Sequence, residues 1–431
     1  MANIRCLISL AAQNNWKLFQ LDINNAFLHG TLHEEVYMKI PEGVSAPAGH
    51  VCRLKKSLYG LKQAPRQWFA RLVEELQFQG FSQSKNDYSL FLKKDADDIV
   101  LVAVYVDDII ITRSNEQSIS DLKTHLHKIF SIKDLGELNY FLGIEVCKCD
   151  NGYVLTQNKF TKELLQDCEF DLSKPASAPF PSVLKLYSDQ GDLYDNPALY
   201  RCYVGKLNFL TNTRPDLAFV VQSLSQFMHS PRLPHVHSLH HTLRYVASTV
   251  GQGILLQATD QLTLRAFCDS DWAACPFTRK SVTGYVLLLG NSPISWKSKK
   301  QSTTSKSSAE AEYRAMSHAS GEVDWLVRLL TEMGLFDLKP VKLYCDSQSA
   351  IHIAKNPVFH ERTKHIEVDC HFTRDKVLEG LIELCYLPTG QQLADVFTKQ
   401  LPVSQQQDLL YKLGMFFSPL PSLRGVLEHI A

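Results

Sequence analysis

The sequence predicts a multidomain protein of mixed α+β and α/β class, and three observations support this. Its 431 residues are enough for two or three domains, each with its own core. Apolar runs with the periods of strands and helices fill residues 1–170, and a Pro- and Ser-rich segment at Ser173–Pro181 interrupts them. A second alternation of strands and helices begins at Gln261.

The expected elements of the first part combine strands rich in Val, Ile, Leu and Phe with helices of three-to-four-residue apolar spacing. In chain order they are a strand at Leu18–Ile23, a helix at Gln67–Gln79, a meander of strands at Tyr88–Lys93, Ile99–Val106 and Ile109–Thr112, a helix at Ser118–Phe130, and a strand at Leu138–Val146.

The later elements follow the same rules. Residues Tyr200–Ser248 have helical spacing, broken by Pro231 and Pro234. Beyond Gln261 the expected order is a strand at Leu262–Cys268, a strand at Val282–Leu289, a helix at Ser308–Glu332, a strand at Val341–Cys345 and a helix at Gln348–Lys355.

Composition narrows the class of protein. Lys and Arg balance Asp and Glu at 45 each, so no global charge attracts a polyanion. The 11 cysteines form no C-x-x-C pair, which favours reduced thiols. We find no cleavable secretory signal and no uncharged apolar run of 18 residues. The sequence thus predicts a soluble, intracellular protein of the cytoplasm, the nucleus or both, with no membrane partner.

Any contact with nucleic acid must therefore be local. Cys52–Arg71 carries six Lys and Arg side chains, no acidic residue and interleaved aromatics, which suit stacking on bases. Trp296–Lys306 is a second basic stretch. A solvated helix face explains the first stretch equally well from residue types alone.

Two adjacent aspartates, Asp107 and Asp108, lie between apolar β-forming runs, where a hairpin turns. Two like charges between apolar strands are costly unless a partner compensates them, and a divalent cation with oxygen ligands does so. By contrast, Asp97 and Asp98 lie in a hydrophilic K-K-D-A-D-D turn that water can solvate. Asp107 and Asp108 therefore indicate metal chemistry, whereas Asp97 and Asp98 indicate a bend.

A third carboxylate joins this pair. Asp22 ends the apolar strand of Q-L-D-I-N-N-A-F, a position where an aspartate alone is most often a turn or helix cap. Together, three carboxylates at the strand ends of one sheet can hold two Mg²⁺ ions that clamp an in-line phosphoryl displacement.

A second set of carboxylates follows the same logic. Asp269 ends a strand, and S-S-A-E-A-E opens a helix in which Ser307 and Glu310 have capping-box spacing. Glu312 instead heads the apolar stripe of that helix, so it needs a partner, and a metal would serve. Asp346 ends another strand and is equally well a helix N-cap, whereas Asp395 alone suggests a solvated helix residue.

The chain shows a family resemblance in the motifs Q-L-D-I-N-N-A-F-L-H-G, L-K-K-S-L-Y-G-L-K-Q-A-P-R-Q-W-F, V-Y-V-D-D-I-I-I-T and D-L-G-E-L-N-Y-F-L-G-I-E-V. These resemble the reverse transcriptase of copia-type LTR retrotransposons, in the same order. The resemblance implies that Asp22, Asp107 and Asp108 are the palm's catalytic metal ligands. It also implies two Mg²⁺ per site, replaceable by Mn²⁺, and RNA template, DNA primer and deoxynucleoside triphosphates as partners.

The same resemblance assigns substrate contacts. Phe27 matches the bulky side chain that excludes a ribose 2′-hydroxyl, although a core aromatic explains it without the resemblance. Gly60, Lys62 and Gln63 match the loop beside the incoming nucleotide and template. Phe141 and Gly143, in F-L-G-I-E, match the hairpin that grips the primer end.

The second carboxylate set resembles the RNase H that this family carries after its polymerase. The resemblance makes Asp269, Glu312, Asp346 and Asp395 catalytic metal ligands that cut the RNA of an RNA–DNA hybrid. It predicts an RNase H-like mixed five-stranded sheet with helices.

On this basis we divide the chain into four parts. Residues 1–172 are a palm with truncated fingers and the start of the thumb, 173–260 a mostly helical thumb and connection, 261–402 the RNase H-like domain, and 403–431 a tail. Two functions remain open: an RNA-directed DNA polymerase with RNase H, or a truncated relic that binds nucleic acid with a silent polymerase and with or without RNase H cleavage. The sequence leaves dimerisation open.

Two further expectations are structural. Arg113 replaces a glycine usual in the family, which predicts a strained or altered turn. The histidines His360, His365 and His371, and the group around His235, match no zinc spacing, so we expect exposed helix faces rather than metal sites.

Overall fold

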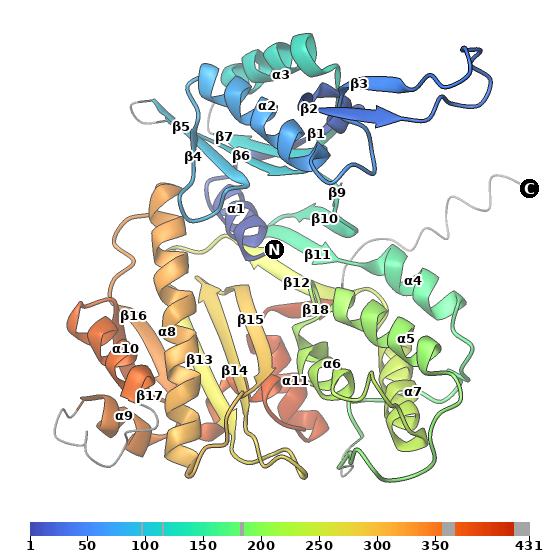
Figure 1. The fold of residues 1–431 in the computed structure, drawn as a ribbon. Coiled ribbons are helices and arrows are strands. Elements are labelled where there is room, and N and C mark those ends of the chain that lie inside the picture. The colour runs from blue at the N-terminus through green and yellow to red at the C-terminus, as the bar shows by residue number, and fades with distance from the viewer. Residues whose placement is uncertain (96–97, 114–115, 182–184, 356–366, 418–431) are drawn as a thin grey trace, which may run out of the picture. The chain divides into compact units, whose positions relative to one another are not determined.

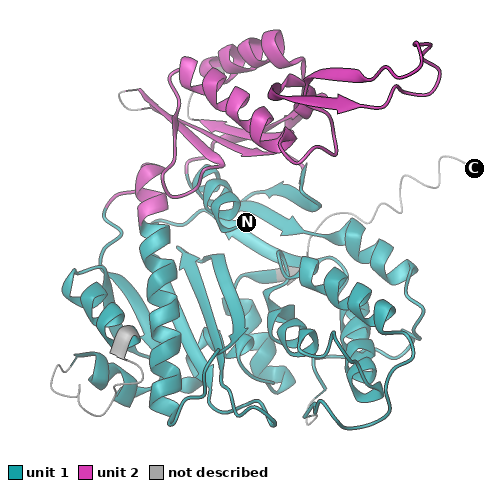
Figure 2. Ribbon diagram, in the orientation of Figure 1, with its two compact units in different colours: residues 1–13, 140–327, 337–431 teal, residues 14–139, 328–336 magenta. Residues whose placement is uncertain are grey.

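The computed structural model describes residues 1–95, 98–113, 116–181, 185–355 and 367–417. It contains two compact units, each built from separate stretches of the chain (Figure 2). One unit comprises residues 14–139 and 328–336; the other comprises residues 1–13, 140–327 and 337–431. Neither unit is continuous in sequence, and the four-part functional division of the chain stays a prediction.

The unit of residues 14–139 is built on a six-stranded sheet in the order β4-β5-β6-β7-β1-β8 (Figure 1). The strands are β1 (Lys17–Ile23), β4 (Ser82–Gln83), β5 (Leu90–Asp95), β6 (Asp98–Tyr105), β7 (Asp108–Arg113) and β8 (Ile132–Glu137). The predicted meander is confirmed, because β5, β6 and β7 pair antiparallel in succession.

Two helices bury their apolar sides against this sheet. α2 (Ala64–Phe78) contributes Trp68, Leu72 and Leu76, and α3 (Glu116–Phe130) contributes Phe130 to the same core. A separate pair of strands, β2 (Thr31–Met38) and β3 (Cys52–Lys56), follows the short helix η1 (Ala26–His29).

Two expectations in this unit are wrong. Arg113 itself is not strained: it is the last residue of β7, in register with Lys17 and Val100, and has no positive φ, while residues 114–115, which follow it, lie outside the described residues. Asp98 is not a solvated bend residue, because it opens β6 and accepts hydrogen bonds from the Arg113 guanidinium. A buried arginine and a partly buried aspartate thus satisfy each other across the strands. Asp97 lies outside the described residues.

The other unit contains a second sheet, in the order β18-β12-β11-β10-β9. Its strands are β9 (Tyr140–Phe141), β10 (Ile144–Cys149), β11 (Gly152–Thr156), β12 (Gln252–Gln257) and β18 (Met415–Phe417). The single strand predicted at Leu138–Val146 is wrong. Leu142 and Gly143 take positive φ values of 51° and 79°, so the chain turns back there into a hairpin.

Helix α1 (Ala2–Gln13) packs against β11 and β12 of this sheet. The other helices of this part form their own core; they are α4 (Asn158–Gln166), α5 (Pro197–Leu210), η2 (Pro215–Leu217), α6 (Ala218–Ser225) and α7 (Leu233–Ser248). The predicted helical stretch is confirmed, with Pro234 inside the first turn of α7, where a missing N–H costs nothing.

The expectation of an exposed histidine face is wrong for His235. Its ring is fully buried and stacks on Phe227 with a centroid distance of 3.8 Å. The Arg232 N–H donates to its Nδ1 at 2.9 Å, and burial lowers its pKa. His235 therefore serves as a helix cap and core residue.

A third sheet, also in this unit, has the order β15-β14-β13-β16-β17. Its strands are β13 (Leu264–Asp271), β14 (Val282–Leu289), β15 (Ser292–Lys300), β16 (Val341–Cys345) and β17 (Ile382–Tyr386). β13 to β15 pair antiparallel, whereas β13, β16 and β17 pair parallel, so the sheet is five-stranded and mixed, as predicted.

Helices flank this third sheet. α8 (Ser308–Glu332) runs alongside it (Figure 1), and α9 (Gln348–Lys355), α10 (Glu367–Leu378), η5 (Thr389–Gln391), η6 (Leu393–Phe397) and α11 (Val403–Lys412) complete the unit. η6 approaches the sheet closely at Gly284, where an added Cβ would lie 2.6 Å from Thr398 Cγ2. Among the described residues, no helix has both the length and the apolarity needed to cross a bilayer.

Candidate active sites

The first site gathers the aspartates of β1 and β7. Asp22 and Asp108 are direct register partners in the antiparallel pair, so their Cα atoms are about 5 Å apart by the geometry of such pairs. Asp107 lies in the two-residue turn between β6 and β7, and its carbonyl accepts a hydrogen bond from the Ile23 N–H at 2.9 Å. The sheet thus brings the three predicted carboxylates to one edge.

The turn that carries Asp107 is held in an unusual conformation. Val106 has φ 57°, in a region that costs a β-branched residue roughly 1–3 kcal/mol. The buried Trp68 indole donates to the Val106 carbonyl at 2.7 Å, and the same ring packs edge-on against Phe130. Core packing of α2 and α3 therefore fixes the turn.

Electrostatics couple these groups. Burial raises the pKa of Asp108, a hydrogen bond from Gln20 opposes this, and the charges of Asp107 and Asp22 raise it further. Burial and the charges of Asp107 and Asp22 also raise the pKa of Tyr59. Tyr59, whose ring also packs against that of Phe27, lies near both aspartates, and sequence reasoning did not select it as a site residue.

The predicted substrate residues fall in both units. Phe27 lies beside the site, with its ring 4.6 Å from that of Tyr59, and is partly buried against the core. Gly60, at φ 95°, Lys62 and Gln63 form the turn that leads into α2.

Phe141 and Gly143 belong to the other unit, so the structure does not place them relative to the aspartates. Phe141 is buried, and a Cβ on Gly143 would lie 2.7 Å from Phe209 Cζ.

The second site collects carboxylates from four elements of one unit. Asp269 lies on β13 and Asp346 directly follows β16. Glu312 lies in the first turns of α8 and Asp395 in η6. Because β13 and β16 are parallel neighbours, the carboxyl ends of both strands meet at one edge of the sheet.

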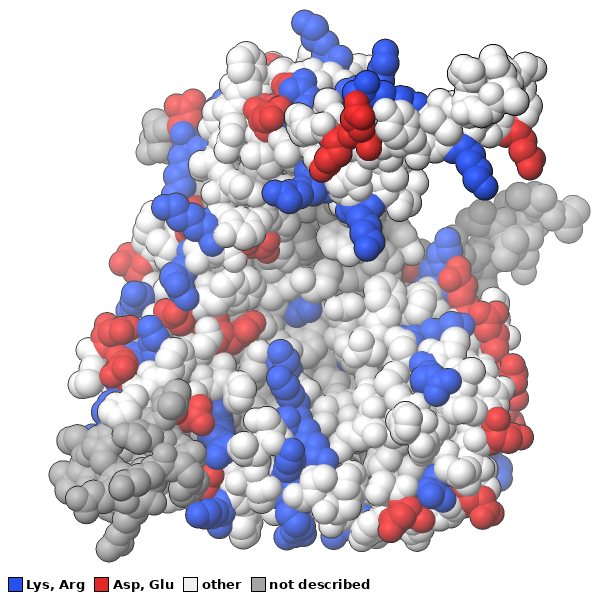
Figure 3. Space-filling view, in the orientation of Figure 1, with Lys and Arg blue, Asp and Glu red and all other residues white. Residues whose placement is uncertain are grey.

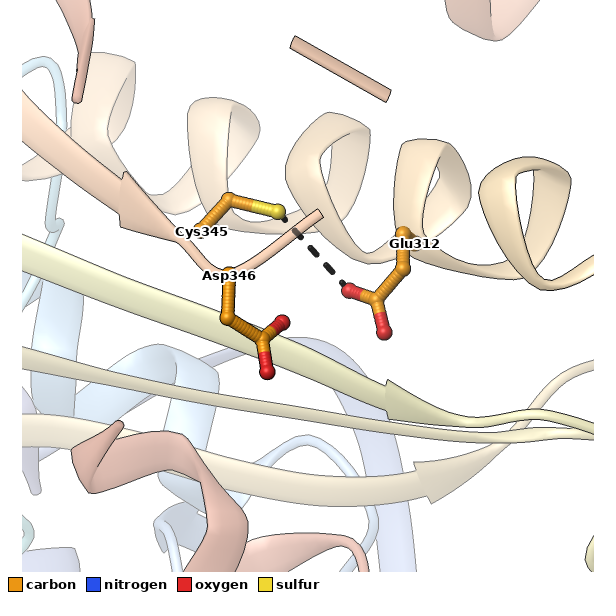
Figure 4. A group of neighbouring side chains, drawn as sticks. All are labelled: Glu312, Cys345 and Asp346. Carbon is orange, nitrogen blue, oxygen red and sulfur yellow. Dashed lines mark hydrogen bonds between the residues drawn. The ribbon is translucent and has the colours of Figure 1, made fainter. Parts of the chain in front are cut away.

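Figure 4 shows the part of this site around Glu312. One potential ligand atom from each of Glu312, Cys345 and Asp346 lies within 4.8 Å of the other two. Among the described residues, this is the group of three His, Cys, Asp or Glu side chains close enough together to share a metal ion. The Ser270 N–H donates to Glu312 Oε1 at 3.2 Å, and the Cys345 thiol donates to Glu312 Oε2 at 3.8 Å.

A lysine completes the site. Lys399 Nζ lies 2.9 Å from Asp395 Oδ1 and 3.5 Å from Asp269 Oδ2. The Thr398 hydroxyl donates to Asp269, and the Thr389 hydroxyl donates to Asp346 at 2.8 Å. Sequence reasoning missed Lys399, although its position four residues after Asp395 on a predicted helix is the spacing of an ion pair.

One cation among four carboxylates leaves excess negative charge. Burial raises the pKa of Asp395 to about 7, and the Asp269 charge adds to this. Burial also raises the pKa of Glu312 and of Asp269. Such a donor set of hard oxygens with uncompensated charge fits a divalent cation such as Mg²⁺.

The predicted role of Glu310 as a capping residue at the start of α8 is confirmed. The Ser307 hydroxyl accepts from the Glu310 N–H at 3.2 Å, and Glu310 Oε2 accepts from the Lys306 N–H at 2.7 Å. Glu310 also pairs with Arg314 at 2.9 Å. It is therefore occupied at the helix start, while Glu312 faces the carboxylates. His360 and His365 lie outside the described residues.

Comparison with known proteins places the chain in a family. Residues 1–182 match the family model described as reverse transcriptase (RNA-dependent DNA polymerase). The Pol polyproteins of the Arabidopsis thaliana transposons RE1 and RE2 are 41% and 42% identical to this chain over 96% and 99% of its length. The match covers 28% and 29% of those proteins, so the chain spans less than a third of their length.

Two further comparisons concern shorter proteins. A putative transposon Ty5-1 protein of Saccharomyces cerevisiae is 31% identical over 308 residues, which are 70% of this chain and all of that protein. A solved N-terminal RNase H domain of Mycobacterium tuberculosis, fused to maltose-binding protein, aligns with 35% of this chain and 98% of that one, at 12% identity and a TM-score of 0.25. By its sequence relatives, the chain belongs to the copia-type retrotransposon Pol family, with a reverse transcriptase.

Proposed function

We propose that the chain performs two phosphoryl transfers on RNA and DNA: RNA-directed DNA synthesis at Asp22, Asp107 and Asp108, and RNase H cleavage at Asp269, Glu312, Asp346 and Asp395. The substrates are an RNA template, a DNA primer and deoxynucleoside triphosphates for the first site, and an RNA–DNA hybrid for the second. The family membership supports the polymerase, and the clustered carboxylates of the mixed sheet support the nuclease.

In the nuclease the four carboxylates would hold two Mg²⁺ ions, which supply Lewis acidity and activate water for an in-line displacement. The chain's own residues set the geometry. Ser270 N–H and Thr389 fix Glu312 and Asp346 through hydrogen bonds. The Thr398 hydroxyl donates to Asp269, and Lys399 pairs with both Asp269 and Asp395. Each carboxylate is therefore oriented before substrate arrives, which lowers the reorganisation that catalysis requires.

In the polymerase the cross-strand pair of Asp22 and Asp108 and the turn residue Asp107 would hold the ions, and Mn²⁺ would substitute for Mg²⁺ at both sites. The Trp68 hydrogen bond keeps the Val106–Asp107 turn in place. Phe27, whose ring packs against that of Tyr59 at a tilt of 50°, would contact the sugar of the incoming nucleotide and exclude a 2′-hydroxyl.

The observation that carries the proposal is the convergence of four distant carboxylates on one end of the mixed sheet, with three of them buried. Asp269, Glu312 and Asp395 have exposed fractions of 2%, 7% and 1%. Burying several carboxylates beside one lysine destabilises a fold, so such a cluster is expected where function requires it. Such clusters of shifted pKa values are typical of catalytic sites.

The test measures hybrid cleavage and primer extension on the same preparations with Mg²⁺. We expect Asp269→Asn to abolish cleavage and leave extension, and Asp107→Asn/Asp108→Asn to abolish extension and leave cleavage. Asp408→Asn, an exposed aspartate of α11, is the matched control and should retain both. Cleavage that survives Asp269→Asn would remove the nuclease from the proposal. A wild-type chain that never extends a primer would remove the polymerase and favour a nucleic-acid-binding protein with RNase H.

A further inference from the structure

A hollow of about 400 Å³ borders the turn between β13 and β14, within one compact unit. Phenylalanine rings form much of its wall. Phe180 and Phe219 pack with a centroid distance of 6.0 Å, and both line the hollow. Phe227 and Phe277, which also line it, pack at 6.3 Å. The hollow therefore offers a ligand a preformed apolar wall, as small-molecule sites usually do.

One residue of this wall is a nucleophile. Cys275, in the turn after β13, is 7% exposed and lines the hollow, so a molecule held there reaches its sulfur. Lys300 Nζ donates to Cys275 Sγ at 2.8 Å. The Thr278 hydroxyl and the backbone N–H groups of Thr278 and Phe277 donate to the same sulfur. A thiol is a weak acceptor, whereas a thiolate accepts all of these hydrogen bonds, so the surroundings favour the thiolate.

The cation beside this sulfur is fixed in place. Lys300 Nζ also donates to Gln226 Oε1 at 2.8 Å and lies 4.6 Å from the centroid of the Phe277 ring. Its charge is therefore held against Cys275 Sγ before any ligand arrives. An adjacent lysine is one of the features that activate cysteines in proteins.

The wider surroundings are cationic as well. β15, which carries Lys300, has two further lysines, and Figure 3 shows Lys and Arg side chains gathered over this strand. The charged groups that line the hollow are Lys185 and Lys399, which are cations, and Asp271, which is an anion. A net positive environment stabilises a thiolate further.

The effect on Cys275 differs from that on other partly or fully buried cysteines of the chain. Burial raises the pKa of the Cys275 thiol, but the hydrogen bonds from Lys300 and Thr278 outweigh burial, so the pKa is lowered. By contrast, burial raises the pKa of Cys6 to about 12, and it also raises the pKa of Cys147. Burial alone thus makes a thiol of this chain inert, and the donors around Cys275 reverse that.

We propose that Cys275 is a site of covalent modification, at which its thiolate adds to an α,β-unsaturated carbonyl compound whose apolar body occupies the hollow. The sulfur forms a bond to the β-carbon, and the electron pair of the carbon–carbon double bond moves to give an enolate. The enolate takes a proton from water, which leaves hydroxide. Lys300 stays protonated throughout, and the addition needs no oxidant or reductant. The inference depends on neither carboxylate site.

The test compares two cysteines of the same chain, because Cys202 is exposed and serves as an internal reference. The probe is N-phenylmaleimide, an apolar unsaturated carbonyl compound, and digestion followed by mass spectrometry gives the initial rate at each thiol. At about pH 6.5 we expect Cys275 to react about fivefold faster than Cys202, because more of it is thiolate. Lys300→Met should remove this advantage, whereas Lys299→Met, at an exposed lysine of the same strand, should keep it.

A second reagent tests the hollow. In N-hydroxyethylmaleimide a small polar group replaces the phenyl ring, so we expect it to favour Cys275 over Cys202 less than N-phenylmaleimide does. Equal preferences for the two reagents would contradict the apolar ligand. A wild-type Cys275 that reacts no faster than Cys202 with N-phenylmaleimide would overturn the proposal, and this comparison needs no variant that could misfold.

Discussion

At the scale of single residues, each candidate site has one side chain that donates to its carboxylates and offsets part of the cost of placing them together. Lys399 bridges Asp269 and Asp395 in the second site. In the first site the Gln20 side-chain amide donates to Asp108 Oδ1 at 3.1 Å. The aspartates at the ends of apolar strands, and Glu312 at the head of an apolar helix stripe, could be selected from the sequence because such residues need a partner, whereas Asp395 was selected only through the family resemblance. The partner Lys399 was not selected, since a lysine four residues after an aspartate is common on solvated helices.

We expect Lys399→Met to destabilise the chain in the absence of divalent cations by about 3 kcal/mol, because it leaves Asp269 and Asp395 buried without a cation. Urea unfolding in EDTA measures this. Lys412→Met, which removes the exposed ion pair with Asp408, is the control and should cost less than about 1 kcal/mol. Equal losses for the two variants would show that Lys399 does not compensate the site.

The pH dependence follows from Asp395. Its pKa is raised to about 7 in the folded chain, so the folded state holds a proton that the unfolded state releases above about pH 4. The stability that Asp395 contributes is therefore present below pH 4 and falls as the pH rises to 7. In EDTA, the Tm of the wild type should fall relative to that of Asp395→Asn between pH 5 and pH 7.5. A constant difference would contradict the raised pKa.

At the scale of elements, the apolar periodicity of the sequence predicted best those helices and strands that have the same kind of surroundings along their whole length. β14, β16, α8 and α9 have the predicted bounds, because buried strands and one-sided helices show their pattern locally. β15 was missed because its outer half alternates lysines with other polar residues at a sheet edge. α1 was missed because it is buried on nearly every side, so its apolar residues show no stripe.

The turn between β6 and β7 depends on α2. We expect Trp68→Phe to speed hydrogen exchange of β6 and β7, because the Val106 carbonyl loses its donor and the strained turn is released. Trp272→Phe, which removes a similar hydrogen bond from a half-exposed indole to the Ser305 carbonyl, is the control. Unchanged exchange in β6 and β7 would mean that the core alone fixes the turn.

The approach of η6 to the third sheet depends on Gly284. We expect Gly284→Ala to destabilise the fold by about 2 kcal/mol and to impair hybrid cleavage, because its Cβ would displace the segment that carries Asp395 and Lys399. Gly321→Ala, in the middle of α8 with no atom closer than 3.9 Å, should instead stabilise the fold by about 0.5 kcal/mol. Chemical unfolding distinguishes the two; a neutral Gly284→Ala would show that η6 has room to move.

At the scale of the whole molecule, the two sites lie in different compact units, and neither unit is one continuous stretch of chain. Residues 1–13 pack with residues far along the sequence, as the contacts of Arg5 with Ile294 and Trp296 show. No local pattern reveals such a pairing, because it depends on which distant surfaces are complementary. The family resemblance predicted the order of the functional parts along the chain. Only the structure showed that α1 belongs to the same compact unit as residues 140–327 and 337–431.

Two separate carboxylate sites predict two separable sets of metal-binding events. Calorimetric titration of the chain with Mn²⁺ tests this most directly. We expect Asp269→Asn to remove one set and leave the other, and Asp22→Asn/Asp108→Asn to remove the complementary set. A wild-type chain that binds no ion, or a single set lost equally in both variants, would contradict the account.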